Sequence, residues 1–160
     1  MTLTIEPAAP ADVPVILELI RELAEFERLL DQCVATEAQL HDGIFGPQPS
    51  AYVLMAREAA EVAGFALYFH NFSTFLAKPG IYLEDLYVRP KFRGRGHGEA
   101  LLRALAQRAL ARGCGRLEWS VLDWNQRAID FYKSLGAAPL DEWTMYRVTG
   151  EALQKLAEGE

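Results

Sequence analysis

The sequence contains little of what disulfide frameworks, metal sites and membrane spans are built from. Only two of its 160 residues are cysteines, Cys33 and Cys114, and they form no Cys-x-x-Cys pair. The three histidines, at positions 41, 70 and 97, are not at metal-ligand spacing. No apolar run approaches the length of a membrane span. These absences argue against a disulfide scaffold and a zinc site, and we expect neither a metal cofactor nor a membrane partner.

The beginning of the chain and its charge narrow the class further. Residues 1–6 lack the basic and apolar segments of a secretory signal, so we expect a cytoplasmic protein. The net charge is −6 and the isoelectric point is near 5.1. Nucleic-acid binding usually requires a basic face, so we expect no nucleic-acid partner. The acidic balance suits a cationic small molecule instead.

The pattern of apolar residues predicts one alternating α/β domain over residues 1–160. No repeat or linker interrupts the chain, which is long enough to bury its own core. Because an early hairpin is followed by a strand–helix–strand crossover, the fold class is α/β with a mixed central sheet, antiparallel in its N-terminal part and parallel in its centre, flanked by helices. Strands are predicted over residues 2–6, 51–57, 62–71, 81–88, 116–122 and 143–148, and helices from Asp12, from a Thr36–Gln39 capping box, over 99–112, over 125–135 and near the C-terminus.

A glycine-rich turn between a strand and a helix is the most informative feature. Residues 93–98 read Arg-Gly-Arg-Gly-His-Gly, after the apolar run 82–88 and before the helical run 99–112. Such a turn presents unpaired backbone N–H groups at the positive end of a helix dipole, where a phosphate is favoured. Basic residues crowd the same stretch of an otherwise acidic chain, and they are Arg89, Lys91, Arg93 and Arg95. The turn therefore predicts a phosphate-containing ligand.

Two common phosphate sites do not fit this turn. A P-loop would close on Gly-Lys-Ser/Thr, whereas Gly98 is followed here by Glu99 and Ala100. A dinucleotide fingerprint would need glycine or alanine at Glu99, although Glu118 lies about where its ribose-binding acid would stand. A negative side chain beside a pyrophosphate is also unfavourable. Neither a nucleotide kinase nor a dehydrogenase is therefore indicated.

The motif Arg93-x-x-Gly96-x-Gly98 stands between two further characteristic segments, residues 82–88 and 124–137. Together they resemble the GNAT N-acetyltransferase superfamily. The resemblance covers nearly the whole chain and is strongest to the diamine acetyltransferase branch, which includes spermidine/spermine and thialysine acetyltransferases. It implies a GNAT acyl-CoA N-acyltransferase fold, acetyl-CoA as co-substrate and a homodimer.

The same resemblance implies how acetyl-CoA is bound. Residues 94–99 would hold the pyrophosphate, the backbone of residues 86–88 the pantetheine arm, and residues 125–128 its other side. Tyr132 would donate a proton to the departing thiolate, although its spacing from Ile129 alone indicates a core tyrosine. The implied cofactor-binding residues are Leu86, Tyr87, Val88, Arg93, Gly94, Arg95, Gly96, His97, Gly98, Glu99, Asn125, Gln126, Arg127 and Ala128.

The chemistry of amine acetylation requires a base. A lysine-like amine has a pKa of roughly 10.4, so deprotonating it at pH 7 costs about 4.6 kcal/mol. Glu84 and Asp85 lie inside an apolar strand, where pleat alternation predicts that they point to opposite faces and burial would raise a carboxyl pKa. From the residues alone, a structural carboxylate paired with arginine fits either position equally well. We predict Glu84 as a base acting through water and Asp85 as a substrate-binding or structural carboxylate.

An acidic pocket with an aromatic wall is predicted for the amine. Residues 70–80 contain no acid and have Thr74 where the polyamine enzymes carry one. We therefore rank a small lysine analogue such as thialysine before a diamine or polyamine. The resemblance implies six substrate-binding residues, Phe26, Glu27, Glu118, Trp119, Ser120 and Asp141, and the chemistry of the strand adds Glu84 and Asp85.

Two other functions stay open at this stage. A protein N-acetyltransferase would use the same cofactor on a polypeptide substrate. A non-catalytic acyl-CoA sensor would need only the phosphate turn, whereas Glu84, Asn125 and Tyr132 are all present here. Because neither cysteine lies in a motif, direct transfer in a ternary complex is preferred to a covalent acyl-enzyme.

Overall fold

A computed structural model describes residues 2–159, which divide into two compact units, residues 2–122 and residues 123–159. The first unit is built on a five-stranded sheet in the order β1-β2-β3-β4-β5. Its elements are β1 (Leu3–Pro7), α1 (Val13–Phe26), α2 (Glu37–Phe45), β2 (Tyr52–Glu58), β3 (Glu61–Ser73), β4 (Lys78–Val88), α3 (His97–Arg112) and β5 (Leu117–Trp119). Short 3₁₀ turns span Pro10–Asp12, Leu30–Gln32 and Pro90–Phe92. The second unit contains α4 (Gln126–Ser134) and α5 (Gly150–Glu158).

The sheet is mixed, as predicted. Strands β1 to β4 pair antiparallel with their neighbours, and β4 pairs with β5 in parallel. The parallel pair needs a crossover connection, which α3 supplies between β4 and β5. The glycine-rich turn therefore lies in the connection between β4 and α3.

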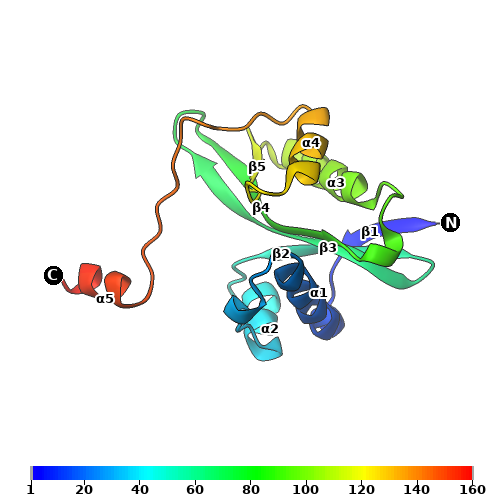
Figure 1. Ribbon diagram of the computed structural model, residues 1–160, viewed down its shortest axis with the longest axis horizontal. Coiled ribbons are helices and arrows are strands. Elements are labelled where there is room, and N and C mark those ends of the chain that lie inside the picture. Colours follow the sequence, from blue (N-terminus) through cyan, green and yellow to red (C-terminus); the bar gives the residue numbers. More distant parts are fainter. Residues whose placement is uncertain (1, 160) are drawn as a thin grey trace. The chain divides into compact units, whose positions relative to one another are not determined.

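Helices cover both faces of the sheet in the first unit. Figure 1 shows α1 and α2 on one face and α3 on the other. Successive residues of β2 point to opposite faces of the sheet. Val53 and Met55 belong to the core under α1 and α2, whereas Leu54 and Ala56 are buried on the other face. On α3 the buried residues follow the helical period, and they are His97, Leu101, Leu102, Leu105 and Ala109.

Local signals in the sequence account for several element ends. The side chain of Thr36 accepts a hydrogen bond from the Gln39 N–H, and the Gln39 side chain caps the Thr36 N–H in return. The side chain of Asn125 accepts from the Ala128 N–H and begins α4. Gly113, at a φ of +78°, ends α3. These three boundaries confirm the predicted helices.

Three strand predictions were wrong, two in their boundaries and one in the presence of a strand. The Pro79–Gly80 pair does not precede β4 but lies inside it, because Pro79 pairs with Phe72 at the end of a long hairpin. Strand β5 covers only 117–119 of the predicted 116–122. Residues 143–148 form no strand: a sheet needs a partner for its hydrogen bonds, and no described strand pairs with them.

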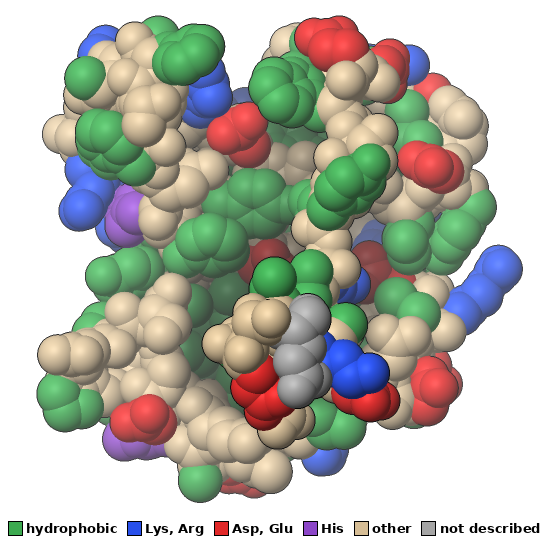
Figure 2. All heavy atoms as spheres, turned by 90° about the vertical axis from the view of Figure 1, so that its left-hand side faces the viewer, with side chains coloured by type: hydrophobic (Ala, Val, Ile, Leu, Met, Phe, Trp, Pro, Cys, Tyr) green, Lys and Arg blue, Asp and Glu red, His purple; other side chains and the backbone are tan. Residues whose placement is uncertain are grey.

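The surface of the described residues mixes charge with apolar groups. Phe75, at the tip of the β3–β4 hairpin, is 97% exposed, and Tyr146 in the second unit is 90% exposed. On the face drawn in Figure 2, acidic and basic side chains are scattered among hydrophobic ones. Between residues 2 and 159, no helix has the length and apolarity to cross a membrane.

Candidate active site

The sheet opens where β5 ends. Pairing between β4 and β5 covers Ile81, Tyr82 and Leu83 and stops when Leu83 meets Trp119. Strand β4 continues to Val88, and no described strand pairs with this later part on the β5 side. The backbone of residues 84–88 therefore has a free edge.

Hydrogen bonding to β3 shows which backbone groups line that edge. The Arg89 N–H donates to the Ala63 carbonyl, and Tyr87 stands opposite Phe65 of β3. Because successive peptide groups of a strand alternate in direction, the N–H and C=O of Leu86 point away from β3, towards the open side. An extended ligand with amide groups can pair with Leu86 there as a strand would.

A β-bulge places Glu84 at the start of the free edge. Leu83 pairs with Tyr68 and Asp85 with Leu67, so Glu84 is an extra residue without a partner on β3. The bulge interrupts the alternation of side chains along β4. Our prediction of opposite faces for Glu84 and Asp85 assumed a regular pleat, which does not hold here. Bulges commonly re-aim side chains beside functional sites.

Three carboxylates influence one another at this point. Burial, and then the charges of Glu84 and Glu27, raise the pKa of Asp85 from 3.8 to about 6. Burial and the Glu84 charge also raise the pKa of Glu27, which directly follows α1. Glu84 itself is exposed. We call Glu27, Glu84 and Asp85 the acidic trio, and its mutual repulsion makes it a favourable place for an ammonium group.

The glycine-rich turn has the features of a phosphate cradle. None of the backbone N–H groups of residues 94–99 donates to another described residue. A Cβ added at Gly94, Gly96 or Gly98 would meet nothing within 4 Å, so the space on the Cβ side of these glycines is open. Gly94 and Gly96 have φ values of +78° and +80°, which favour glycine. The turn can therefore accept an anionic phosphate group.

The side chain of Arg93 anchors the turn to the protein. Its Nε donates to the Val88 carbonyl at 2.8 Å. Its guanidinium carbon lies 5.3 Å from the ring centre of Phe26 and 5.5 Å from that of Tyr87. Phe26 was predicted to bind substrate, and in the structure its ring contacts this arginine. The structure thus gives Arg93 a positioning contact behind the cradle.

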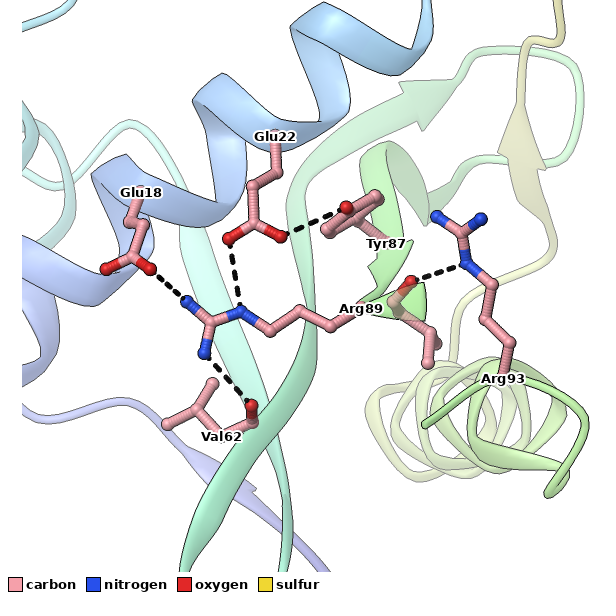
Figure 3. A network of polar contacts seen from close by, with 7 residues as sticks. Glu18, Glu22, Val62, Tyr87, Arg89 and Arg93 are labelled. Carbon is pink, nitrogen blue, oxygen red and sulfur yellow. Dashed lines mark hydrogen bonds and ion pairs between the residues drawn. The ribbon is translucent and has the colours of Figure 1, made fainter. Parts of the chain in front are cut away.

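A second arginine ties β4 to α1. Figure 3 shows Arg89 between two carboxylates of α1, with Nη2 2.6 Å from Glu18 and Nε 3.1 Å from Glu22. Its Nη1 donates to the Val62 carbonyl at 3.3 Å. The Tyr87 hydroxyl donates to the other oxygen of Glu22 at 3.1 Å. This network holds the end of β4 against α1, whereas the sequence indicated only a local positive charge at Arg89.

The residues predicted on β5 have partners in the sheet. The Glu118 carboxylate accepts a long hydrogen bond of 3.4 Å from the Asn71 side chain. Ser120 and the Tyr82 hydroxyl are 2.7 Å apart. Trp119 stands opposite Leu83, next to Glu84. Of the predicted substrate residues on this strand, Trp119 therefore lies nearest in register to the acidic trio.

The second unit carries the remaining predicted residues. Its α4 begins at the Asn125 cap, the Gln126 side chain donates to Asp130 at 2.7 Å, and the Tyr132 ring centre lies 5.7 Å from that of Phe131. Asp141 follows α4 in an exposed segment. These residues stay predictions for the cofactor and substrate sites.

Comparison with known proteins decides the family. Residues 16–137 match the family described as Acetyltransferase (GNAT) family. The chain belongs to the GNAT acetyltransferase family. A thialysine N-epsilon-acetyltransferase of Bos taurus is 42% identical over 96% of both chains. An L-ornithine N5-acetyltransferase of Arabidopsis thaliana is 36% identical over 93% of this chain and 85% of the relative.

The solved structures agree with the fold. An integron cassette protein from the mobile metagenome of V. cholerae superposes with a TM-score of 0.84 at 31% identity, covering 99% of both chains. This GNAT protein is therefore an amine N-acetyltransferase with acetyl-CoA as co-substrate, as predicted. The cradle, the open edge of β4 and the acidic trio are the parts of its first unit that fit this activity.

Proposed function

We propose that this GNAT enzyme acetylates the primary amine of a small cationic substrate, a lysine analogue such as thialysine first and a diamine or polyamine second. The acidic trio beside the open edge of β4 carries the proposal. The raised pKa values of Glu27 and Asp85 mean that their charged forms are disfavoured while no cation is present. An ammonium group would relieve this repulsion, so the same residues attract a cation and can take its proton.

Deprotonation of the amine is assigned to the pair at the bulge. Glu84 remains a candidate base acting through water, as predicted from the chemistry of the reaction. The pKa of about 6 for Asp85 supports this neighbouring carboxylate for the same role, because a base works best when its pKa lies near the operating pH. Glu27 would then hold the ammonium group before transfer.

The transfer itself is proposed as a direct attack. The amine nitrogen attacks the thioester carbon while the Leu86 N–H, on the open edge of β4, donates to the developing oxyanion. The C–S bond then breaks, the Tyr132 hydroxyl gives its proton to the leaving thiolate, and the nitrogen loses its remaining extra proton, which restores the tyrosine. A phenol with a pKa of roughly 10 can protonate a thiolate whose acid has a pKa of about 8.5 once the thiolate is desolvated.

The ranking of substrates no longer rests on Thr74. Thr74 lies in the turn before Lys78, where β4 begins, and Glu84 lies six residues further along the strand than Lys78. At about 3.3 Å per residue, this is roughly 20 Å, more than a small amine spans. The absence of an acid at Thr74 therefore does not explain selectivity within one chain. Thialysine and L-ornithine, named for two relatives, both carry a terminal amine on an amino acid, and this supports the lysine analogue.

A panel of amines tests the proposal. Thialysine, lysine, ornithine, putrescine and spermidine would each be offered with acetyl-CoA, with thiol release as the rate and mass spectrometry of the product as the control. We expect the highest kcat/KM for thialysine or a close analogue. A clear preference for spermidine would reverse the ranking. Tight binding of acetyl-CoA without turnover of any small amine would favour a protein substrate or a sensor.

Two finer expectations remain. We propose that the enzyme is a homodimer, which the resemblance implies, and that it acts in the cytoplasm, which was expected from the first residues of the sequence. Analytical ultracentrifugation of the purified protein at several concentrations measures the first. Fractionation of cells that produce the tagged protein measures the second.

A further inference from the structure

A buried carboxylate lies behind the phosphate cradle. Glu58 is the last residue of β2 and follows Leu54 and Ala56 on the face of the sheet that α3 covers. It is only 4% exposed. A charge in such a place needs partners, because an unpaired buried ion is costly.

Both of its oxygens are bound by residues of the glycine-rich turn. Oε1 lies 2.8 Å from Arg95 Nη1, and Oε2 lies 2.8 Å from His97 Nε2. The hydrogen bond from His97, together with the hydrogen bond and charge of Arg95, lowers the pKa of Glu58 despite the opposing effect of burial. The carboxylate is therefore ionised near neutral pH and can only accept, so Nε2 of His97 carries the proton.

His97 is held on its other sides by the core. It is 5% exposed, begins α3, and its ring stacks on Phe92 with 6.3 Å between ring centres. Its Nδ1 is buried and has no hydrogen-bond partner among the described residues. A side chain that leaves one nitrogen unpaired is fixed mainly by the other nitrogen, and here that bond goes to Glu58.

Side chains that bind the protein alternate with glycines along the turn. Arg93, Arg95 and His97 turn to the protein, whereas the glycines between and after them face open space. Two of the three anchored side chains end on the same carboxylate. The positions of the N–H groups of residues 94–98 thus depend on a residue nearly forty positions earlier in the chain.

We propose that Glu58 is a positioning residue for acetyl-CoA: by binding Arg95 and His97 it fixes the backbone of the cradle with its N–H groups towards the pyrophosphate. The proposal rests on the cradle assignment and adds to it a residue that touches no substrate. It also accounts for the presence of the Glu58 carboxylate behind a site that binds an anion. Its charge is offset locally by Arg95, whose side chain is 41% exposed and has further N–H groups for a phosphate.

One substitution distinguishes this role from a simple effect of charge, because the two predict opposite changes in the affinity for acetyl-CoA. Glu58→Gln removes a negative charge near the phosphates, so charge alone predicts tighter binding of acetyl-CoA. Positioning predicts weaker binding, because the amide cannot accept from Arg95 and His97 together. We expect the Kd for acetyl-CoA, measured by calorimetry without amine, to rise about tenfold. We expect kcat at saturating acetyl-CoA and the KM for the amine to change little.

Glu61→Gln is the matched control. It makes the same chemical change three residues later, in an exposed ion pair with Lys91, and should leave the Kd within about twofold of wild type. Glu58→Asp keeps the charge and shortens the side chain by one methylene. We expect it also to weaken binding, and it carries the test if the glutamine variant unfolds.

A double-mutant cycle checks that Glu58 acts through Arg95. Arg95→Ala should weaken binding in the wild-type background and add little when Glu58 is already glutamine. Additive effects, or a Kd unchanged or lowered in both Glu58 variants, would overturn the positioning role. A wild-type protein that does not bind acetyl-CoA would instead refute the cradle assignment itself.

Discussion

Replacing Asp85 with asparagine should make the enzyme more stable above pH 6. In the unfolded chain an aspartate has a pKa near 3.8, and in the folded protein that of Asp85 is about 6. One pKa unit corresponds to about 1.36 kcal/mol, so ionising Asp85 in the folded state costs up to about 3 kcal/mol. Because Asp85 is only partly buried, solvent screening reduces our expectation to about 2 kcal/mol.

The sign of the pH dependence follows from proton binding. Between pH 3.8 and about 6 the folded state holds the Asp85 proton more tightly than the unfolded state, so this group lowers stability as the pH rises through that window. Asp85→Asn lacks this loss. Its advantage over wild type should be near zero at pH 4 and about 2 kcal/mol at pH 7.5, or roughly 4–8 °C in melting temperature.

Urea unfolding of both proteins at pH 4, 5, 6 and 7.5 measures the difference directly. Glu61→Gln, in its exposed ion pair, is the control and should show no such trend. The same Asp85→Asn variant should lose most of its kcat/KM and the ionisation near pH 6 from its rate profile if Asp85 is the base. A stability difference that does not vary with pH would refute the assigned environment of Asp85. Full activity would return the role of base to Glu84.

Three further substitutions address the other parts of the site. Gly96→Asp places a side chain and a like charge in the open space of the cradle, at a φ of +80°, and should weaken acetyl-CoA binding by more than about tenfold in calorimetry; unchanged affinity would remove the cradle assignment. Tyr132→Phe should leave acetyl-CoA binding nearly intact while lowering kcat by about a hundredfold; a wild-type turnover number would make Tyr132 a packing residue. Glu27→Gln should raise the amine KM several-fold, since a pair of this kind contributes at most about 1 kcal/mol; a KM equal to wild type would exclude Glu27 from the substrate site.

Periodicity and turn chemistry predicted the elements of the first unit well. Alternation along β2 and β3, the Thr36 capping box and Gly113 are local signals, and each element they predicted is present. The glycine-rich turn lies between β4 and α3, as predicted from the same kind of local signal. Its N–H groups are unpaired because a strand, a turn and a helix follow one another directly in the chain.

Features that depend on contacts between distant segments could not be predicted. The bulge at Glu84 arises from the register between β3 and β4, and the sequence shows only the regular alternation that this bulge interrupts. The pairing of Glu58 with His97 joins the end of one strand to the start of a helix. A signal for it existed, because His97 precedes Leu101 by four residues on the buried stripe of α3. The sequence does not say which buried acid such a histidine meets.

The unpaired edge of β4 is also a hazard to the protein that carries it. A row of free N–H and C=O groups can pair with the strand of another molecule, and proteins usually shorten, bend or cover such edges. Here the bulge at Glu84 bends its start, and the Arg93 side chain occupies the Val88 carbonyl at its end. The stretch of edge between the bulge and Val88 is about as long as the stretch that an extended ligand arm can cover. A bound co-substrate would then complete the sheet as a temporary strand, and protein kept without it should be the more prone to aggregate.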